Sequence, residues 1–173
     1  QPTAGSGDSA MYDQTIQPMS RSLGALSNIL RKAEDHCTAK GIKPVALLEF
    51  RLFPDMLSLI RQVQLSCDFA VRGAARLSGG ELPSYPDTET SFEGLQARIA
   101  AVQAALAVYD YATFDAAAPA DVTLPVQGKD MTFSAQQFVS TYCLPQFYFH
   151  VTTAYCILRH NGVEIGKKDY MGV

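Results

Sequence analysis

The residue best suited to chemistry is His150, in the stretch QFYFHVTTAYCILRHNG at positions 146–162. This stretch is apolar on nearly every side, which is typical of a helix that is buried all round. A buried imidazole needs a hydrogen-bond partner or a function, because an unpaired polar group in an apolar interior costs free energy. Since the unperturbed pKa of histidine lies near neutrality, His150 is our candidate catalytic acid or base.

Polar side chains follow His150 along one face of the predicted helix. Steps of four, four and three residues relate Tyr142, Gln146, His150 and Thr153. Such steps place side chains on one face. If this face meets the second long helix, Gln64 and Asp68 complete a polar pocket, and Arg61 reaches its edge. The candidate ligand-binding residues are therefore Arg61, Gln64, Asp68, Tyr142, Gln146 and Thr153. A structural interpretation stays open, in which His150 and the glutamines satisfy one another inside a core.

Other reactive residue types lie in less suitable surroundings. Cys67 and Cys156 fall in apolar stripes without an obvious base, which favours buried packing over a nucleophilic role. His160 stands at a helix end, where a cation interacts favourably with the helix dipole, and His36 is expected to be solvated. The four cysteines are far apart in the sequence, within apolar patterns. That usage favours a reducing compartment and thus a cytoplasmic protein.

Length and composition limit the class of protein. With 173 residues, 47% of them hydrophobic, the chain suits one core, and we expect a single domain over 11–173. The first ten residues, QPTAGSGDSA, lack a basic start and an apolar segment, so we expect a flexible leader or tag remnant rather than a secretory signal. A net charge of −3 and a pI near 5.5 argue against nucleic-acid binding. No apolar run reaches the length of about 18 residues that a membrane span needs.

Hydrophobic periodicity predicts an all-α fold built on a four-helix bundle. A short extra helix and a small hairpin, expected between Asp121 and Phe133, complete it. We expect Asp55 and Thr90 to begin the second and third long helices, Ser134 to cap the last one, and Pro145 to kink it. The four long helices are predicted at 12–39, 55–77, around 92–106 and at 135–160, with the short one beginning at 44.

Three stretches carry a resemblance to a known superfamily: FPDMLSLIRQVQLSCD at 53–68, SYPDTETSFEGLQARI at 84–99 and FHVTTAYCILRHNGVEIGKKDYMG at 149–172. With the order of predicted elements, they resemble the DinB/YfiT-like superfamily, and more narrowly its branch of proteins of unknown function (DUF). The resemblance covers about 11–172 and is most specific in the last stretch. It implies an up-down-down-up four-helix bundle that is commonly dimeric.

The resemblance also implies a metal site, from which this sequence departs. Better-known members hold a divalent metal on three histidines, one on the second long helix and two spaced HxxxH on the last, and include thiol S-transferases and a maleylpyruvate isomerase. Here His150 matches the second histidine of HxxxH, Gln146 stands at the first, and Gln62 or Gln64 stands nearest the third position. Amide oxygens are poor ligands for Zn or Ni. We therefore expect a degenerate site, and no cofactor.

Three hypotheses for the function follow. The first is a metal-free DinB-like protein that binds a small organic molecule in the bundle cavity, with His150 as acid or base for isomerisation or tautomerisation. The second is a metal-dependent thiol S-transferase or hydrolase with unusual ligands to a divalent metal such as Zn or Ni. The third is a non-catalytic dimeric interaction protein. The expected partners are a small-molecule ligand and a second copy of the chain as a homodimer, with no nucleic acid and no membrane.

Overall fold

The computed structural model describes residues 10–173. Four long helices make up most of this part of the chain: α1 (Met11–Lys40), α3 (Leu59–Ser78), α4 (Phe92–Ala107) and α7 (Leu144–His160). The shorter elements are α2 (Pro44–Leu48), α5 (Tyr111–Ala117), β1 (Asp121–Val126), β2 (Lys129–Ser134), α6 (Ala135–Gln137), the π-helix η1 (Phe138–Cys143) and α8 (Lys167–Met171). The predicted flexible leader, residues 1–10, lies outside the described residues apart from Ala10, which precedes α1.

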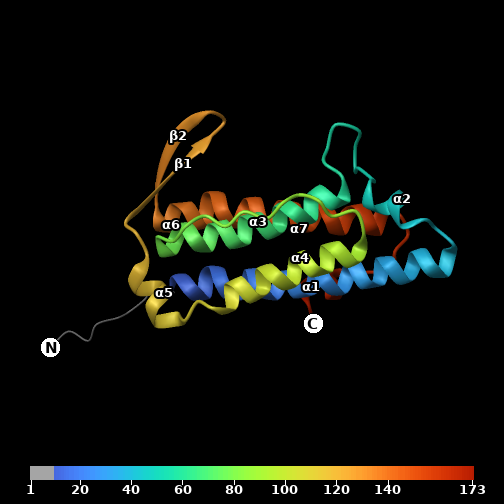
Figure 1. Cartoon of the computed structure of the whole chain (residues 1–173), viewed down its shortest axis with the longest axis horizontal. Coiled ribbons are helices and arrows are strands. Elements are labelled where there is room, and N and C mark those ends of the chain that lie inside the picture. Colours follow the sequence, from blue (N-terminus) through green and yellow to red (C-terminus); the bar gives the residue numbers. More distant parts are fainter. Residues whose placement is uncertain (1–9) are drawn as a thin grey trace.

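The long helices lie side by side, and Figure 1 shows α1 and α7 running in one direction and α3 and α4 in the other. α3 packs against α7 and α4, and α1 packs against α4, α3 and α7. Because α3 and α4 run the same way, the segment 79–91 must return along the length of α3 (Figure 1). Gly79, in the left-handed conformation at a φ of 69°, ends α3 and starts this return.

The core lies where the apolar faces of these helices meet. On α1, apolar residues spaced three and four apart form a stripe that is buried throughout: Ile16, Met19, Leu23, Leu26, Leu30, Ala33 and Cys37. The predicted hairpin is also confirmed, with Asp121 paired to Ser134 at its open end and Val126 to Lys129 at its turn. Val122 and Leu124 are its buried residues, so the hairpin leans one face of β1 on the helices, as a two-stranded sheet must.

Several predicted helix ends are wrong. The second long helix begins at Leu59 rather than Asp55, because 50–58 forms a loop in which Leu59 N–H donates to Phe50 O. The third begins after Ser91 rather than Thr90, since the Ser91 hydroxyl accepts the N–H of Gly94. The helix α5 was not predicted from the sequence.

The last helix is interrupted rather than simply kinked. Ser134 forms the predicted capping box with Gln137, but after α6 the chain forms the π-helix η1. Leu144 N–H bonds to Val139 O, five residues back. The proline ring of Pro145 has no N–H to donate and would clash with the carbonyl of Thr141 in a regular α-helix, which accounts for the wider turn just before it. This wider turn carries Tyr142 and Cys143 against α3.

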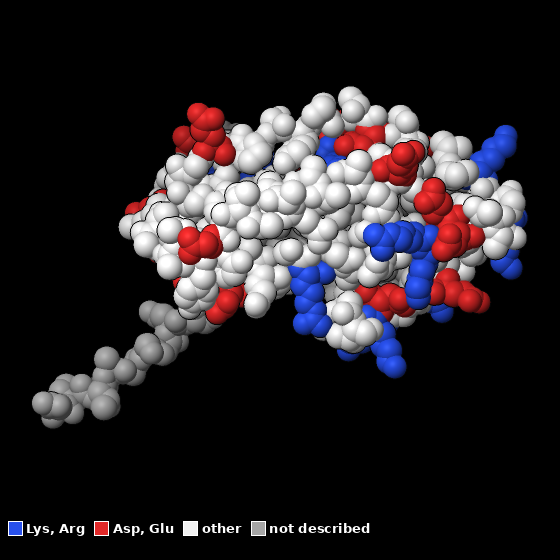
Figure 2. Space-filling view, turned by 60° about the horizontal axis from the view of Figure 1, so that its bottom comes forward, with Lys and Arg blue, Asp and Glu red and all other residues white. Residues whose placement is uncertain are grey.

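Charged residues of both signs share the surface. On the face drawn in Figure 2, Lys and Arg lie interspersed with Asp and Glu, and no continuous basic surface forms there. Among residues 10–173, no helix combines the length and apolar character that crossing a membrane requires.

Gly73 of α3 packs tightly against Cys143 of η1, and this contact can be tested by substitution. A Cβ added to Gly73 would overlap Cys143 Sγ, and both residues are buried. We expect Gly73→Ala to lower the free energy of unfolding by about 1–3 kcal/mol, the usual cost of overpacking a filled core. Urea unfolding measures it. The pair Gly73→Ala with Cys143→Ala should recover part of the loss, because the clashing sulfur is gone.

Gly24→Ala is the matched control, since its Cβ would meet Gln103 Nε2 at an ordinary 3.4 Å. Removing this helix-interior glycine should stabilise the protein by up to about 1 kcal/mol. A Gly73→Ala protein as stable as the wild type would contradict the packing argument.

Candidate functional site

His150 is buried and hydrogen-bonded to α3. Its side chain is 7% exposed, and its Nδ1 lies 2.7 Å from Oε1 of Gln62, which is itself buried. The ring of Phe69 stacks on the imidazole at a centroid distance of 5.6 Å, and Phe149, the preceding residue of α7, packs edge-on against it. Gln62 and His150 thus satisfy each other across the α3–α7 contact.

The hydrogen bonds of Gln62 assign the tautomer of His150. Gln62 Nε2 donates to Leu57 O at 3.2 Å, which turns Oε1 toward the imidazole. Because Oε1 can only accept, Nδ1 carries the proton of the neutral ring. Burial, together with the smaller effect of the positive charge of Arg61, lowers the pKa of His150 from 6.5 to about 4. His150 is therefore neutral at pH 7.

The residues at the superfamily's metal positions do not fit a Zn or Ni site. The choice left open between Gln62 and Gln64 falls on Gln62, because Gln62 is the residue that meets His150. Its amide oxygen and the His150 Nδ1 bond directly to each other, while Gln146 is half-buried and makes no hydrogen bond to a described residue. Over residues 10–173, no three His, Cys, Asp or Glu side chains come together as a ligand set.

Gln64 faces away from His150, toward the segment 79–91, whereas the charge of Arg61 still acts on His150. Gln64 Oε1 accepts from Arg61 Nη1 at 2.7 Å, and Gln64 Nε2 donates to Glu89 Oε2 at 2.7 Å. Arg61 also pairs with Asp87 at 2.6 Å. The expectation that Gln64 joins His150 in one pocket is therefore wrong, because residues 62 and 64 point to different sides of α3.

Arg98 of α4, which was not among the residues predicted from the sequence, is the centre of this polar cluster. Its side chain is 1% exposed, and it bonds to Asp68 Oδ1 at 2.7 Å, to Glu89 at 3.2 Å and to Pro86 O at 3.1 Å. Its Nε is the buried side-chain atom without a partner among the described residues. One feature of the sequence could have identified Arg98 as a buried charge. It stands beside the apolar residues of the third helix and follows a segment with several carboxylates.

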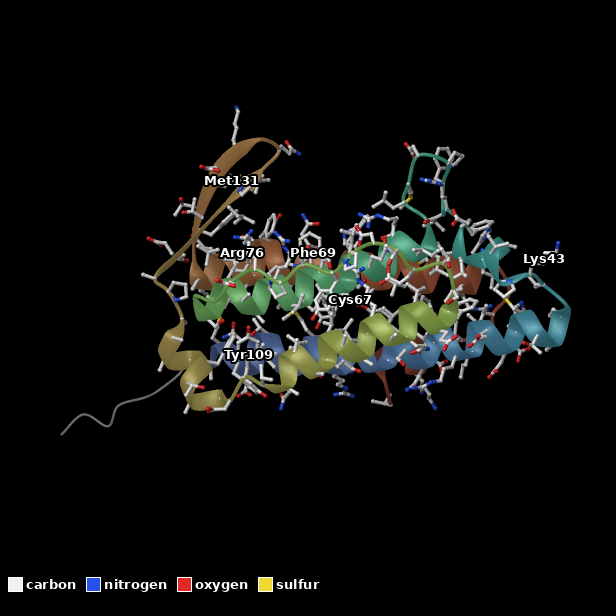
Figure 3. All side chains as sticks on the ribbon, viewed as in Figure 1. Lys43, Cys67, Phe69, Arg76, Tyr109 and Met131 are labelled. Atoms are coloured by element: carbon white, nitrogen blue, oxygen red, sulfur yellow. The ribbon has the colours of Figure 1, made fainter. Side chains whose placement is uncertain are left out.

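A cavity with a volume of about 320 Å³ lies elsewhere, between α3, η1 and β1. Its lining is Leu65, Asp68, Phe69, Arg72, Gly73, Arg76, Leu124, Pro125, Phe138, Tyr142 and Cys143. The structure thus brings two predicted ligand residues, Asp68 and Tyr142, to one cavity. Phe69 separates this cavity from His150, since its ring stacks on the imidazole and meets Tyr142 edge-on at 6.1 Å. Figure 3 shows Phe69 and Arg76 on the side of α3 that faces the hairpin.

The remaining predicted residues do not reach this cavity. Thr153 is buried and its hydroxyl donates to Phe149 O, one turn back in its own helix, at 2.7 Å. Cys67 is buried as predicted, whereas Cys156 is only half-buried, and all four cysteines are free. Burial raises the pKa of both Cys67 and Cys143 to about 12, so neither thiol forms a thiolate near neutral pH.

The lowered pKa of His150 predicts a pH dependence of stability. The unfolded chain takes up the proton near pH 6.5 and the folded protein only near pH 4, so the free energy of unfolding should fall as the pH drops through this window. At about 1.4 kcal/mol per pKa unit, the loss amounts to about 3 kcal/mol at most. Urea unfolding across the window measures it, and His150→Gln should remove it. An NMR titration of His150 with a midpoint near 6.5 would contradict the assignment.

The burial of Arg98 predicts a large cost of removing its charge. Arg98→Met leaves Asp68 and Glu89 without their cation, and we expect a loss of about 3–5 kcal/mol in the free energy of unfolding. Burial alone would raise the pKa of Glu89, but hydrogen bonds from Gln64 and Arg98 outweigh it and lower that pKa. The loss should therefore shrink below about pH 4, where the carboxylates take up protons.

Arg31→Met serves as the control for Arg98→Met, because Arg31 is exposed and bonds only to Asn28 of its own helix. We expect a change of at most about 0.5 kcal/mol there. Equal losses for the two variants would sink the argument for a buried charge.

Comparison with known proteins identifies the family of the chain. The model of the family described as Domain of unknown function (DUF1993) matches residues 11–171. The crystal structure of a DinB family member protein from Shewanella denitrificans is similar over 94% of this chain and 92% of that chain, at 42% sequence identity and a TM-score of 0.85. No curated protein matches. The resemblance stated from the sequence is confirmed, and the chain belongs to the DUF1993 family of DinB-like proteins of unknown function.

Proposed function

We propose that this protein is a metal-free DinB-like binding protein whose four long helices constitute an up-down-down-up bundle and whose ligand is a small organic molecule. The ligand occupies the cavity between α3, η1 and β1. The observation that carries the proposal is the cavity itself, whose volume of about 320 Å³ falls in the range of small-molecule sites. Two residues that the sequence pattern selected for ligand contact, Asp68 and Tyr142, line it.

The walls of the cavity suit an organic ligand. Phe69, Leu124 and Phe138 supply apolar surface from three different elements. Tyr142 is held among aromatic rings, with Phe138 stacked at 5.8 Å and Phe133 tilted at 5.9 Å. A ring fixed in this way presents its hydroxyl without losing further conformational entropy, and mostly apolar walls with a few oriented polar groups are typical of ligand sites.

His150 supports this site rather than carrying out acid–base chemistry. A catalytic base works best when its pKa is near the working pH. The pKa of His150 is about 4, and its Nδ1 proton is engaged by Gln62. The imidazole instead backs Phe69, whose ring lines the cavity. We therefore favour binding over isomerisation, the reaction that the sequence suggested.

The other two hypotheses have less support. A metal-dependent thiol S-transferase would need a ligand set that one imidazole and two amides do not offer. An interaction protein is the second candidate, because apolar side chains are exposed around the loop 50–58, including Phe53 at 64%, and on α7, where Phe149 is 55% exposed. Homodimer formation and a cytoplasmic location stay predictions.

Ligand-observed and protein-observed NMR test the binding proposal with a fragment panel that contains benzamide, benzoate and benzylamine. We expect at least one compound, at millimolar concentration, to shift the amide resonances of 65–76 and 138–143. Leu65→Trp should abolish these shifts, because Leu65 lines the cavity and the larger ring fills it. Leu52→Trp, on the exposed loop, should leave them intact. A panel without any such shift, or shifts that survive Leu65→Trp, would overturn the proposal.

A further inference from the structure

Two arginines in the cavity have no partner. Arg72 and Arg76 of α3 are half-buried and line the cavity. Neither forms a hydrogen bond or an ion pair with any described residue. Other arginines that bond nothing, such as Arg159, are in the exposed class, where water solvates the charge. Since no nitrogen of Arg72 or Arg76 is both buried and unpaired, solvent reaches the two guanidinium groups, and the wall of the cavity carries two cations that are free to bind an anion.

The two charges also act on each other. Arg72 and Arg76 are one helical turn apart and therefore lie on the same face of α3, a spacing at which like charges repel. Burial lowers the pKa of Arg76, and the charge of Arg72 lowers it further. The cavity thus holds a concentrated positive charge, formed by adjacent cations that nothing in the described chain neutralises.

The nearby carboxylates do not compensate this charge. Asp68 lies one turn before Arg72 and lines the same cavity, but its Oδ1 is bonded to the buried Arg98 at 2.7 Å. Asp121 lines a shallow depression next to the hairpin that Arg76 also borders, and no ion pair joins the two residues. Asp68 is the one carboxylate that lines the cavity, and it is already bonded to Arg98. The positive charge of Arg72 and Arg76 therefore remains available to a ligand.

We propose that the cavity selects organic anions, with Arg72 and Arg76 binding a carboxylate or phosphate group and Phe69 and Phe138 packing against the apolar part of the same molecule. Guanidinium groups bind both anionic groups through paired hydrogen bonds. The inference rests on the proposed function and adds the charge of the ligand. Figure 3 shows Arg76 and Phe69 on the same side of α3, which agrees with one ligand meeting both.

Matched benzene derivatives test the preference in the full-length wild-type protein. Benzoate and phenyl phosphate carry the two anionic groups, benzamide is the neutral counterpart of benzoate, and benzylamine is the cation. In an NMR titration at low salt we expect benzoate or phenyl phosphate to bind about tenfold more tightly than benzamide, as charge-assisted hydrogen bonds do. Benzylamine should bind more weakly than benzamide. The two anions together tell whether the site favours carboxylate or phosphate.

Arginine variants test the residues. Arg72→Gln and Arg76→Gln should each reduce the affinity for the preferred anion several-fold, and the double variant should bind anion and benzamide equally. Arg159→Gln removes the same charge from an exposed position and should change nothing. The melting temperatures of the Arg72 and Arg76 variants should equal or exceed that of the wild type, because a repulsion is removed. A purely structural arginine would instead lower the melting temperature when replaced.

The outcomes separate this inference from the binding proposal. Equal affinity of the wild type for benzoate, phenyl phosphate and benzamide would overturn the anion preference and leave the binding site standing. An equal loss of anion affinity in Arg159→Gln would overturn it as well, since the effect would then come from net charge. If no compound binds at the cavity, the binding proposal itself fails.

Discussion

The buried guanidinium of Arg98 is the constraint on which most of this structure depends. A charge that is 1% exposed must be neutralised, and Arg98 draws Asp68 from α3 and Glu89 from the return segment 79–91 around it. These bonds hold the long return segment against the helices at the point where α3 and α4 meet. They also decide the charge of the neighbouring cavity, because the carboxylate that Arg98 engages is no longer free to pair with Arg72, one helical turn further along.

The second constraint is the contact of α3 with the last helix. At one end, a hydrogen bond joins His150 to Gln62, and both buried side chains need this partner. At the other, Gly73 admits Cys143 to a distance that no larger residue allows. Phe69 lies between these two contacts. Its ring stacks on His150, and its side chain also lines the cavity. The histidine and the cavity are thus neighbours in the packing but separate in chemistry, which is why we assign the first to support and the second to binding.

Much of the scaffold could be predicted, because helices and hairpins leave periodic patterns in a single sequence. The buried stripe of the first helix, the hairpin before the last helix and the capping box at Ser134 follow from such patterns. The errors lie where tertiary contacts override local signals. Asp55 has the type of a helix cap, yet the loop 50–58 delays the helix to Leu59, and the last helix contains a π-helix before Pro145 that periodicity does not reveal.

The sequence by itself determined the helical framework and the family resemblance, and it has two glutamines and one histidine where that resemblance implies metal ligands. Only the tertiary structure decided that Gln62, and not Gln64, meets His150, and that Asp68 serves Arg98 instead of the predicted pocket. The physical reason is that helical spacing tells which side chains share a face, but not which neighbouring helix that face meets. Partners from distant segments, such as Arg98 and the hairpin residue Leu124, enter only when the chain is folded.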